Sequence, residues 1–176
     1  PTTLDVNLNA GIVSFQGMMD ESTALPKDGP TWVFHKSDGT YYGTTYGATP
    51  KNLFNAGDYK AKLSMGAAEV EVAFAVVAGE TKDMVVLLGS GMARVNATYS
   101  QGGESVPDGT AVELYKAAGI SGEKKWITTD YGNNKVFQAP AGEYVIVVKL
   151  NLAEAEVPVK IIAGQEVPVA VNLNAG

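Results

Sequence analysis

The 176-residue sequence predicts an all-β protein that consists of two tandem β-sandwich modules. Three observations lead to this fold class. Short segments rich in Val, Ile, Thr, Tyr and Phe alternate apolar and polar residues, as half-buried strands do. Glycine-rich turns separate these segments, and 20 residues of the chain are glycine. The second half of the chain also repeats the first half, which indicates two related modules.

Five strands of the first module follow from a period of two or from a short apolar run. They are expected at Ile12–Gln16, Thr31–Lys36, Asp58–Met65, Ala68–Val77 and Thr81–Leu88. Asp38-Gly39 predicts a tight hairpin turn after the second of these strands, because glycine tolerates positive φ. The polar segment Asp20–Pro30 is expected to be the crossover between the first two strands. About seven short strands per module are typical of a small sandwich.

The second module shows the same order of patterns. Its strands are expected at Val112–Lys116, Trp126–Thr129, Glu143–Leu150, Glu154–Ile162 and Val167–Leu173. Gln101–Thr110 takes the place of the first crossover. Ala153–Val157 could form a turn of helix, but Pro158 and the strand at the repeat-related position favour a strand.

The second module repeats the first along most of its length. A shift of 80 residues aligns Asp28-Gly29 with Asp108-Gly109, and a five-residue insertion around Ile120–Lys124 changes the shift to 85. From Tyr41 to Gly91 the shift of 85 runs without a gap, and 15 of the 51 aligned pairs are identical. We therefore expect two homologous modules, at residues 1–88 and 89–176.

The two ends of the chain share one motif. Val6-Asn7-Leu8-Asn9-Ala10-Gly11 recurs as Val171-Asn172-Leu173-Asn174-Ala175-Gly176, with a degenerate copy at Val86–Gly91. The array of modules is therefore expected to continue beyond one or both ends of the sequence, with each module contacting only its neighbours. Only Gly89-Ser90-Gly91 can act as a hinge, so we expect a stiff two-module rod.

Composition excludes several functional classes. The chain has no cysteine, which rules out a disulfide scaffold, a thiolate zinc site and an iron–sulfur protein. Its single histidine is too few for a histidine-rich metal site. A net charge of −6 indicates no nucleic-acid partner, because such partners need a clustered basic face. The apolar stretches are only strand-length, so no membrane span is expected.

The C-terminal half of each module carries a recurring pattern. An apolar residue precedes Ala-Gly-acid-Tyr, two alternating strands, Ala-Gly-Glu or Ala-Gly-Gln, and a final strand that ends in Leu. The matching segments are Phe54–Leu63, Ala68–Leu88, Val136–Val148 and Ala153–Leu173. The pattern resembles the carboxypeptidase-regulatory-like and transthyretin-like β-sandwich modules and the related Ig-like repeats of bacterial surface or envelope proteins. The resemblance implies a spacer, adhesion or assembly role in an extracellular, periplasmic or cell-envelope setting, without catalytic residues.

Aromatic residues provide the candidate binding site. The candidates are Tyr41, Tyr42 and Tyr46 in the first module and Trp126 and Tyr131 at the repeat-related places of Tyr41 and Tyr46. Exposed rings can stack on sugars or anchor a protein partner. The alternative is that some of these rings cap the sandwich core. Tyr59 and Tyr144 are expected to be structural corner tyrosines, and Trp32 and Phe34 to be core residues.

Two further groups could hold a metal or act as an acid and a base. Asp5–Gly11 resembles the start of a calcium loop, but its glycine comes one residue late, and alternation of Val6 and Leu8 favours a half-buried strand. The pairs Glu69/Glu71 and Glu154/Glu156 could serve as acid and base. Carboxylates two apart on a strand share one face, and we expect these on a solvated outer face.

A catalytic role for the single histidine is not expected. The repeat partner of His35 is Tyr115, which preserves size but not metal ligation or proton transfer. No nucleophile and orienting acid accompany it in a recognisable motif.

These observations together predict a non-enzymatic structural or interaction segment of a larger surface, envelope or filament protein. No metal and no cofactor are expected. The predicted partner is a protein or further copies along a repeat array, with edge strands as the assembly surface. The alternative is a carbohydrate-binding module that uses the exposed aromatic residues.

Overall fold

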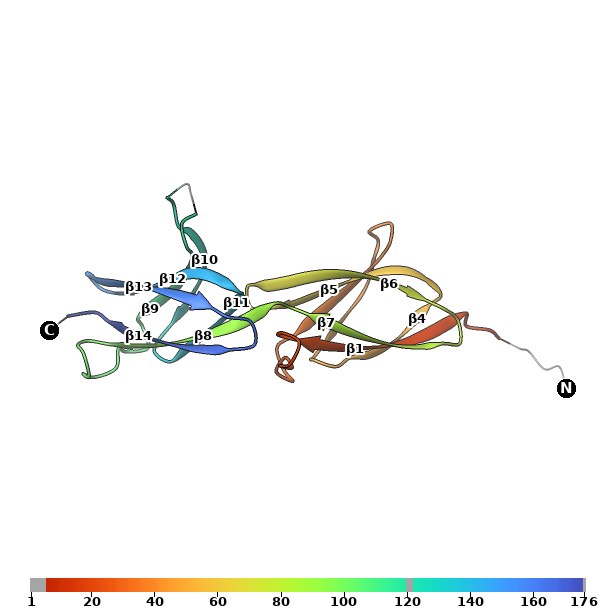
Figure 1. Ribbon diagram of the computed structural model, residues 1–176, viewed down its shortest axis with the longest axis horizontal. Helices are drawn as coiled ribbons and strands as arrows, with labels where there is room; N and C mark the ends of the chain where they lie inside the picture. Colours follow the sequence, from red (N-terminus) through yellow and green to blue (C-terminus); the bar gives the residue numbers. More distant parts are fainter. Residues whose placement is uncertain (1–5, 120–121, 176) are drawn as a thin grey trace. The chain divides into compact units, whose positions relative to one another are not determined.

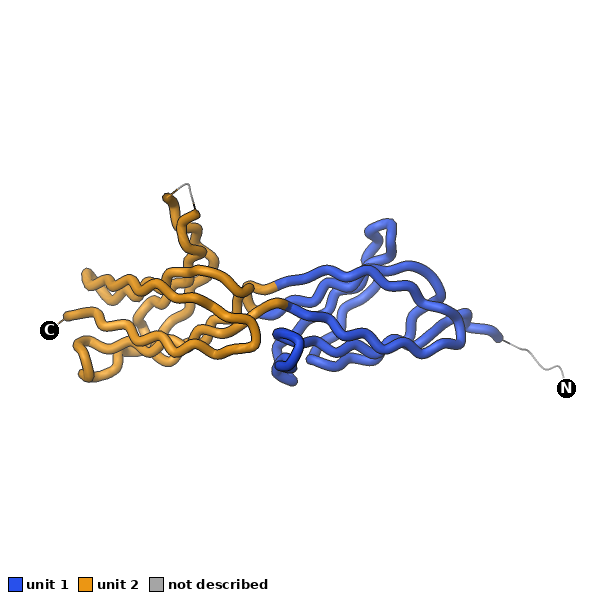
Figure 2. Tube along the Cα trace, in the orientation of Figure 1, with its two compact units in different colours: residues 1–65, 69–88 blue, residues 66–68, 89–176 orange. Residues whose placement is uncertain are grey.

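The computed structural model describes residues 6–119 and 122–175. This part of the chain contains fourteen strands and no helix (Figure 1), which confirms the all-β fold class. Within it there is accordingly no helix that could cross a membrane. The chain divides into two compact units (Figure 2). Unit 1 comprises residues up to 65 and 69–88, and unit 2 comprises residues 66–68 and those from 89 onward.

Unit 1 is a sandwich of a three-stranded and a four-stranded sheet. Its strands are β1 (Ala10–Met18), β2 (Thr31–Lys36), β3 (Tyr41–Tyr46), β4 (Lys51–Asn55), β5 (Gly57–Met65), β6 (Ala68–Val76) and β7 (Thr81–Leu87). The strand orders are β4-β1-β7 and β3-β2-β5-β6. β1 and β7 run parallel to each other. The segment 19–30 connects β1 in one sheet to β2 in the other, which confirms the expected crossover.

Aromatic rings from both sheets fill the core of unit 1. Phe15 of β1 lies 5.0 Å from Trp32 and 5.3 Å from Phe34, both of β2, between ring centroids. Phe74 of β6 meets Phe15 edge-on at 5.4 Å. Contacts of this kind bury large apolar areas and add stability beyond burial alone. The prediction that Trp32 and Phe34 are core residues is confirmed, since both are almost fully buried.

Unit 2 repeats this arrangement of strands. Its strands are β8 (Ser90–Thr98), β9 (Ala111–Lys116), β10 (Lys125–Tyr131), β11 (Lys135–Pro140), β12 (Gly142–Leu150), β13 (Ala153–Ile161) and β14 (Glu166–Asn172). The strand orders are β11-β8-β14 and β10-β9-β12-β13, and β8 and β14 run parallel. Pro158 lies within β13, an edge strand, so the strand prediction for this segment is confirmed.

The core of unit 2 is mainly aliphatic. The repeat places Val95, Val112, Leu114, Ala139 and Val159 where unit 1 has Phe15, Trp32, Phe34, Phe54 and Phe74. Phe137 adds volume on β11. The same arrangement of strands therefore encloses two different sets of core side chains.

The predicted corner tyrosines are confirmed in both units. Tyr59 and Tyr144 are buried, and each hydroxyl donates to the carbonyl oxygen four residues upstream, on Asn55 at 2.9 Å and on Pro140 at 2.8 Å. These bonds hold the turn that precedes β5 and the turn that precedes β12.

Candidate functional site

The aromatic residues singled out by the sequence lie on the edge strand of each four-stranded sheet. Tyr41 and Tyr46 are on β3, and Trp126 and Tyr131 are on β10. Their exposed fractions are 61%, 72%, 55% and 60%. Each unit therefore presents two large rings beside backbone groups that can pair with another strand.

A β-bulge brings the two rings of each unit to one face. The register between β2 and β3 shifts between Phe34 and His35, and that between β9 and β10 shifts between Trp126 and Thr128. In a regular strand, two rings five positions apart point to opposite faces, and the extra residue of the bulge brings them to the same face. Tyr41 and Tyr46, like Trp126 and Tyr131, consequently point to the same side of the sheet.

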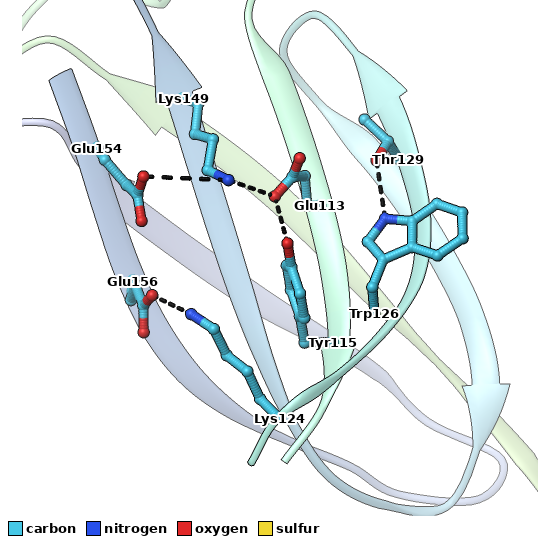
Figure 3. A network of polar contacts seen from close by, with 8 residues as sticks. All are labelled: Glu113, Tyr115, Lys124, Trp126, Thr129, Lys149, Glu154 and Glu156. Carbon is cyan, nitrogen blue, oxygen red and sulfur yellow. Dashed lines mark hydrogen bonds and ion pairs between the residues drawn. The ribbon is translucent and has the colours of Figure 1, made fainter. Parts of the chain in front are cut away.

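A hydrogen bond to a threonine fixes the first ring of each pair. The hydroxyl of Tyr41 lies 3.1 Å from Thr44 Oγ1. In unit 2 Trp126 Nε1 donates to Thr129 Oγ1, also at 3.1 Å (Figure 3). The shift of 85 maps one threonine onto the other. We name these matched sets the aromatic strips: Tyr41, Thr44 and Tyr46 in unit 1, and Trp126, Thr129 and Tyr131 in unit 2.

Tyr42 does not share the exposed face of the unit 1 strip. Its ring stacks on Phe54 with centroids 5.6 Å apart and lies 4.9 Å from Tyr59. Its hydroxyl accepts a hydrogen bond from the amide of Asn55 at 3.2 Å. Tyr42 is thus held at the rim of the core by packing and by a backbone contact.

Charged side chains form a network on the same outer face of unit 2 (Figure 3). Glu113 of β9 accepts a hydrogen bond from the Tyr115 hydroxyl at 2.8 Å and lies 3.0 Å from Lys149 Nζ of β12. Lys149 also lies 4.0 Å from Glu154. Lys124 pairs with Glu156 and lies 5.0 Å from the centre of the Tyr115 ring.

Glu113 is the most enclosed charged group of this network, with a side chain that is 16% exposed. Burial raises its pKa, but hydrogen bonds from Lys149 and Tyr115 and the nearby lysine charges hold the pKa below its ordinary value. The hydrogen bond to Glu113 in turn raises the pKa of Tyr115 and that of Lys149. Glu113 is therefore an ionised partner for two donors rather than a proton donor at neutral pH.

Unit 1 uses simpler cross-strand ion pairs at the related places. Lys60 pairs with Glu71 at 3.1 Å, and Lys62 with Glu69 at 2.6 Å. Unit 2 keeps both glutamates, as Glu154 and Glu156, but has valines where unit 1 has the two lysines. All four glutamates are exposed and face lysines, which confirms the predicted solvated face.

The other sequence candidates do not converge on a site. His35 is half-buried and meets the Tyr41 ring edge-on at 6.0 Å. Residues 6–119 and 122–175 contain no cluster of three or more His, Asp or Glu able to hold a metal ion. Asp5 of the calcium-loop candidate lies outside the described residues. The half-buried strand expected at Val6 and Leu8 does not form within the described residues, where both side chains are exposed and precede β1.

Comparison with known proteins gives structural neighbours only. No family model matches the chain, and no curated protein matches it. The shaft pilin SpaA of Lactobacillus rhamnosus GG is similar over 93% of this chain and 97% of its own, at 9% identity and a TM-score of 0.42. A minor pilin of Streptococcus agalactiae is similar over 92% of this chain and 94% of its own, at 15% identity and a TM-score of 0.38. The TIE protein of Bacillus anthracis is similar over 93% of this chain, at 15% identity and 0.39. The chain spans only 34% of the length of that protein.

Proposed function

We propose that the chain is a non-enzymatic assembly segment of a larger extracellular or cell-envelope protein, and that its aromatic strips bind other copies of the chain. The proposed modules have the boundaries 1–88 and 89–176 and belong to the carboxypeptidase-regulatory-like or transthyretin-like type. Contact between copies would form where β3 and β10, the edge strands, carry exposed rings.

One observation carries this proposal. Five aromatic residues in the core of unit 1 have aliphatic counterparts in unit 2, so the fold does not require aromatic rings at those positions. The exposed rings, in contrast, remain aromatic in both units: Tyr41 corresponds to Trp126, and Tyr46 to Tyr131. Exposed rings gain little from packing within their own unit. Their presence in both units therefore supports a role in contact with another molecule.

The geometry of the strips also favours recognition. The contact of Tyr41 with Thr44, and that of Trp126 with Thr129, limits the freedom of the first ring before any partner binds. A ring that is ordered in advance loses less conformational entropy on binding. The absence of catalysis is proposed because the enclosed carboxylate, Glu113, is engaged by Tyr115 and Lys149.

Sedimentation velocity over a range of protein concentrations tests this proposal. The chain should self-associate, and the double variants Tyr41→Ala/Tyr46→Ala and Trp126→Ala/Tyr131→Ala should each weaken association at least tenfold. The matched control Val85→Ala/Leu152→Ala removes two exposed apolar side chains outside the strips and should leave association unchanged. A monomer at all concentrations, or equal effects of the strip and control variants, would contradict the proposal.

Carbohydrate binding is the second candidate function, and one local feature favours it. A hollow of about 340 Å³ adjoins Tyr46 and is lined by Lys27, Asp28 and Thr49 among others. A ring beside charged and hydroxyl groups suits a sugar, which offers an apolar face and several hydroxyls. A glycan array probed with the chain should then give hits that Tyr46→Ala abolishes. An array without hits would remove this candidate and leave the assembly proposal standing.

A further inference from the structure

The motif that occurs at both ends of the chain lies in two different environments. Near the C-terminus, Val171 and Leu173 are buried in the core of unit 2, at 1% and 6% exposure. In the degenerate copy, Val86 and Leu88 are buried in unit 1, at 1% and 5%. Near the N-terminus the same two side chains are exposed, Val6 at 71% and Leu8 at 69%. Identical residues are thus core residues at one place and solvent-facing at the other.

The backbone after each of these segments adopts one conformation. Asn9, Gly89 and Asn174 have positive φ, at 47°, 64° and 49°. The side chain of Asn7 accepts a hydrogen bond from the amide of Asn9 at 2.9 Å, and that of Asn172 accepts from Asn174 at 3.0 Å. Asparagine is among the few residues other than glycine that tolerate this region of φ. At both ends of the chain the turn is capped by the side chain of the asparagine two residues upstream.

The residues that follow attach to the next unit in the same way. The carbonyl oxygen of Asn9 accepts from the amide of Ala56 at 2.7 Å, and that of Gly89 accepts from Ala141 at 2.9 Å. One residue later, Ala10 and Ser90 accept from Gly79 and Gly164, at 2.8 Å and 2.9 Å. From residue 9 onward, the N-terminal segment therefore joins unit 1 as residue 89 onward joins unit 2.

In units 1 and 2, the residue just before the turn extends the last strand of the unit. The amide of Leu88 donates to Met18 O at 2.8 Å, and that of Leu173 donates to Thr98 O at 3.0 Å. Leu88 and Leu173 thus extend the pairing of β7 with β1 and of β14 with β8 by one residue. Leu8 holds the corresponding place ahead of β1.

We infer that Val6–Leu8 is the end of the last strand of another sandwich module of this type, which precedes unit 1 in the same polypeptide. Val6 and Leu8 fill the core of that module as Val171 and Leu173 fill unit 2. This goes beyond the proposed function, since it holds whatever the aromatic strips bind. It assigns the segment 6–8 to one module and Asn9 onward to the next.

Paired aspartate substitutions in the chain test this assignment. Val6→Asp/Leu8→Asp should leave the thermal midpoints of both units unchanged, because these side chains belong to neither unit. Val171→Asp/Leu173→Asp should unfold unit 2. If that variant cannot be purified, Val171→Ala/Leu173→Ala should lower the midpoint of unit 2 alone. A loss of stability in unit 1 on changing Val6 and Leu8 would overturn the assignment.

A seamless fusion supplies the decisive test, since the shared motif lets two copies be joined without a linker. Residues 1–176 are followed directly by residues 12–176 of a second copy, so that one Val-Asn-Leu-Asn-Ala-Gly closes one module and opens the next. Amide hydrogen exchange should show all four units folded. Val171→Asp/Leu173→Asp in the shared motif should unfold only the unit before it, and the control Asn172→Asp should unfold none. Unfolding of the unit after the motif, or failure of the unmodified fusion to fold at the junction, would overturn the inference.

Native limited proteolysis of the natural polypeptide tests whether the preceding module exists. The inference predicts a resistant, module-sized fragment that ends near Asn9. Rapid digestion of everything ahead of Val6 would contradict it.

Discussion

The hydroxyl of Tyr59 donates a hydrogen bond to the carbonyl oxygen of Asn55, 2.9 Å away and four residues upstream. Unit 2 repeats the bond between Tyr144 and Pro140 at 2.8 Å. Both rings are buried, although the core around them is aromatic in one unit and aliphatic in the other. The tyrosine corner is therefore a part of the module that does not depend on the surrounding core side chains.

Removal of either hydroxyl should weaken one unit. Tyr59→Phe and Tyr144→Phe each delete a hydrogen bond and leave a carbonyl without that donor, which costs about 1 kcal/mol of unfolding free energy. Urea denaturation followed by amide exchange would measure the loss in each unit. The exposed Tyr46→Phe serves as control and should have no effect; an equal loss there would contradict the structural role of the corners.

Alkaline pH should destabilise unit 1 through Tyr59. Burial, together with neighbouring Tyr42, raises the pKa of Tyr59 to about 12 from an ordinary value of 10.0. Because the folded pKa is the higher one, this contribution to stability is full below pH 10 and is lost as the pH rises towards 12. Urea midpoints of wild type and Tyr59→Phe, measured from pH 8 upward, should converge. Parallel pH profiles would show that Tyr59 does not titrate in this way.

Two glycines allow close backbone approach at the start of the first strand of each unit. A Cβ atom at Gly11 would overlap the carbonyl oxygen of Val77, and one at Gly91 would overlap that of Ile162. Gly11→Ala and Gly91→Ala should each cost about 1–3 kcal/mol of unfolding free energy, since backbone must move. Gly43→Ala and Gly119→Ala, where a Cβ meets nothing within 4 Å, are the controls for thermal denaturation. Alanine tolerated equally at all four sites would contradict the close approach.

Acidic pH should lower the stability of unit 2 through protonation of Glu113. Since its pKa lies below the ordinary 4.5, the ionised carboxylate stabilises the folded state above that pH, and the contribution is lost as the pH falls through the lowered pKa. Glu113→Gln should cost about 1 kcal/mol at pH 7 and should flatten the acid limb of the stability profile. Glu143→Gln, whose partner Lys160 lies 3.8 Å away on the surface, is the matched control. An unchanged acid limb in Glu113→Gln would contradict the assignment.

The periodicity of the sequence was sufficient to predict most of the sandwich. Apolar alternation marks β2, β5 and β6 well, because one face of each is buried against aromatic or aliphatic partners. Four strands were not among those predicted: β3, β4, β8 and β11. β3 carries the bulge that breaks its alternation. β4 and β11 are short edge strands, and Lys51-Asn52-Leu53 shows no alternation because Leu53 is exposed. The turn at Asp38-Gly39 was predicted correctly between β2 and β3.

The candidate site was only partly predictable. Sequence identified the aromatic positions but could not separate Tyr42 from Tyr41, because the bulge that redirects the rings leaves no period-two signal. Thr44 and Thr129 were missed, although their identity across the repeat was available as a signal. The bond between Glu113 and Lys149 could not be found from the repeat, since unit 1 has Val33 and Ser64 at those places.

Amide hydrogen exchange at low and high protein concentration would locate the contact between copies of the chain. We predict that high protein concentration slows exchange in peptides covering Tyr41–Tyr46 and Lys125–Tyr131. Alanine at Tyr41, Tyr46, Trp126 and Tyr131 together should abolish this change. Concentration-dependent protection confined to β6 and β13, at the opposite edges of the same sheets, or no protection at all, would contradict it.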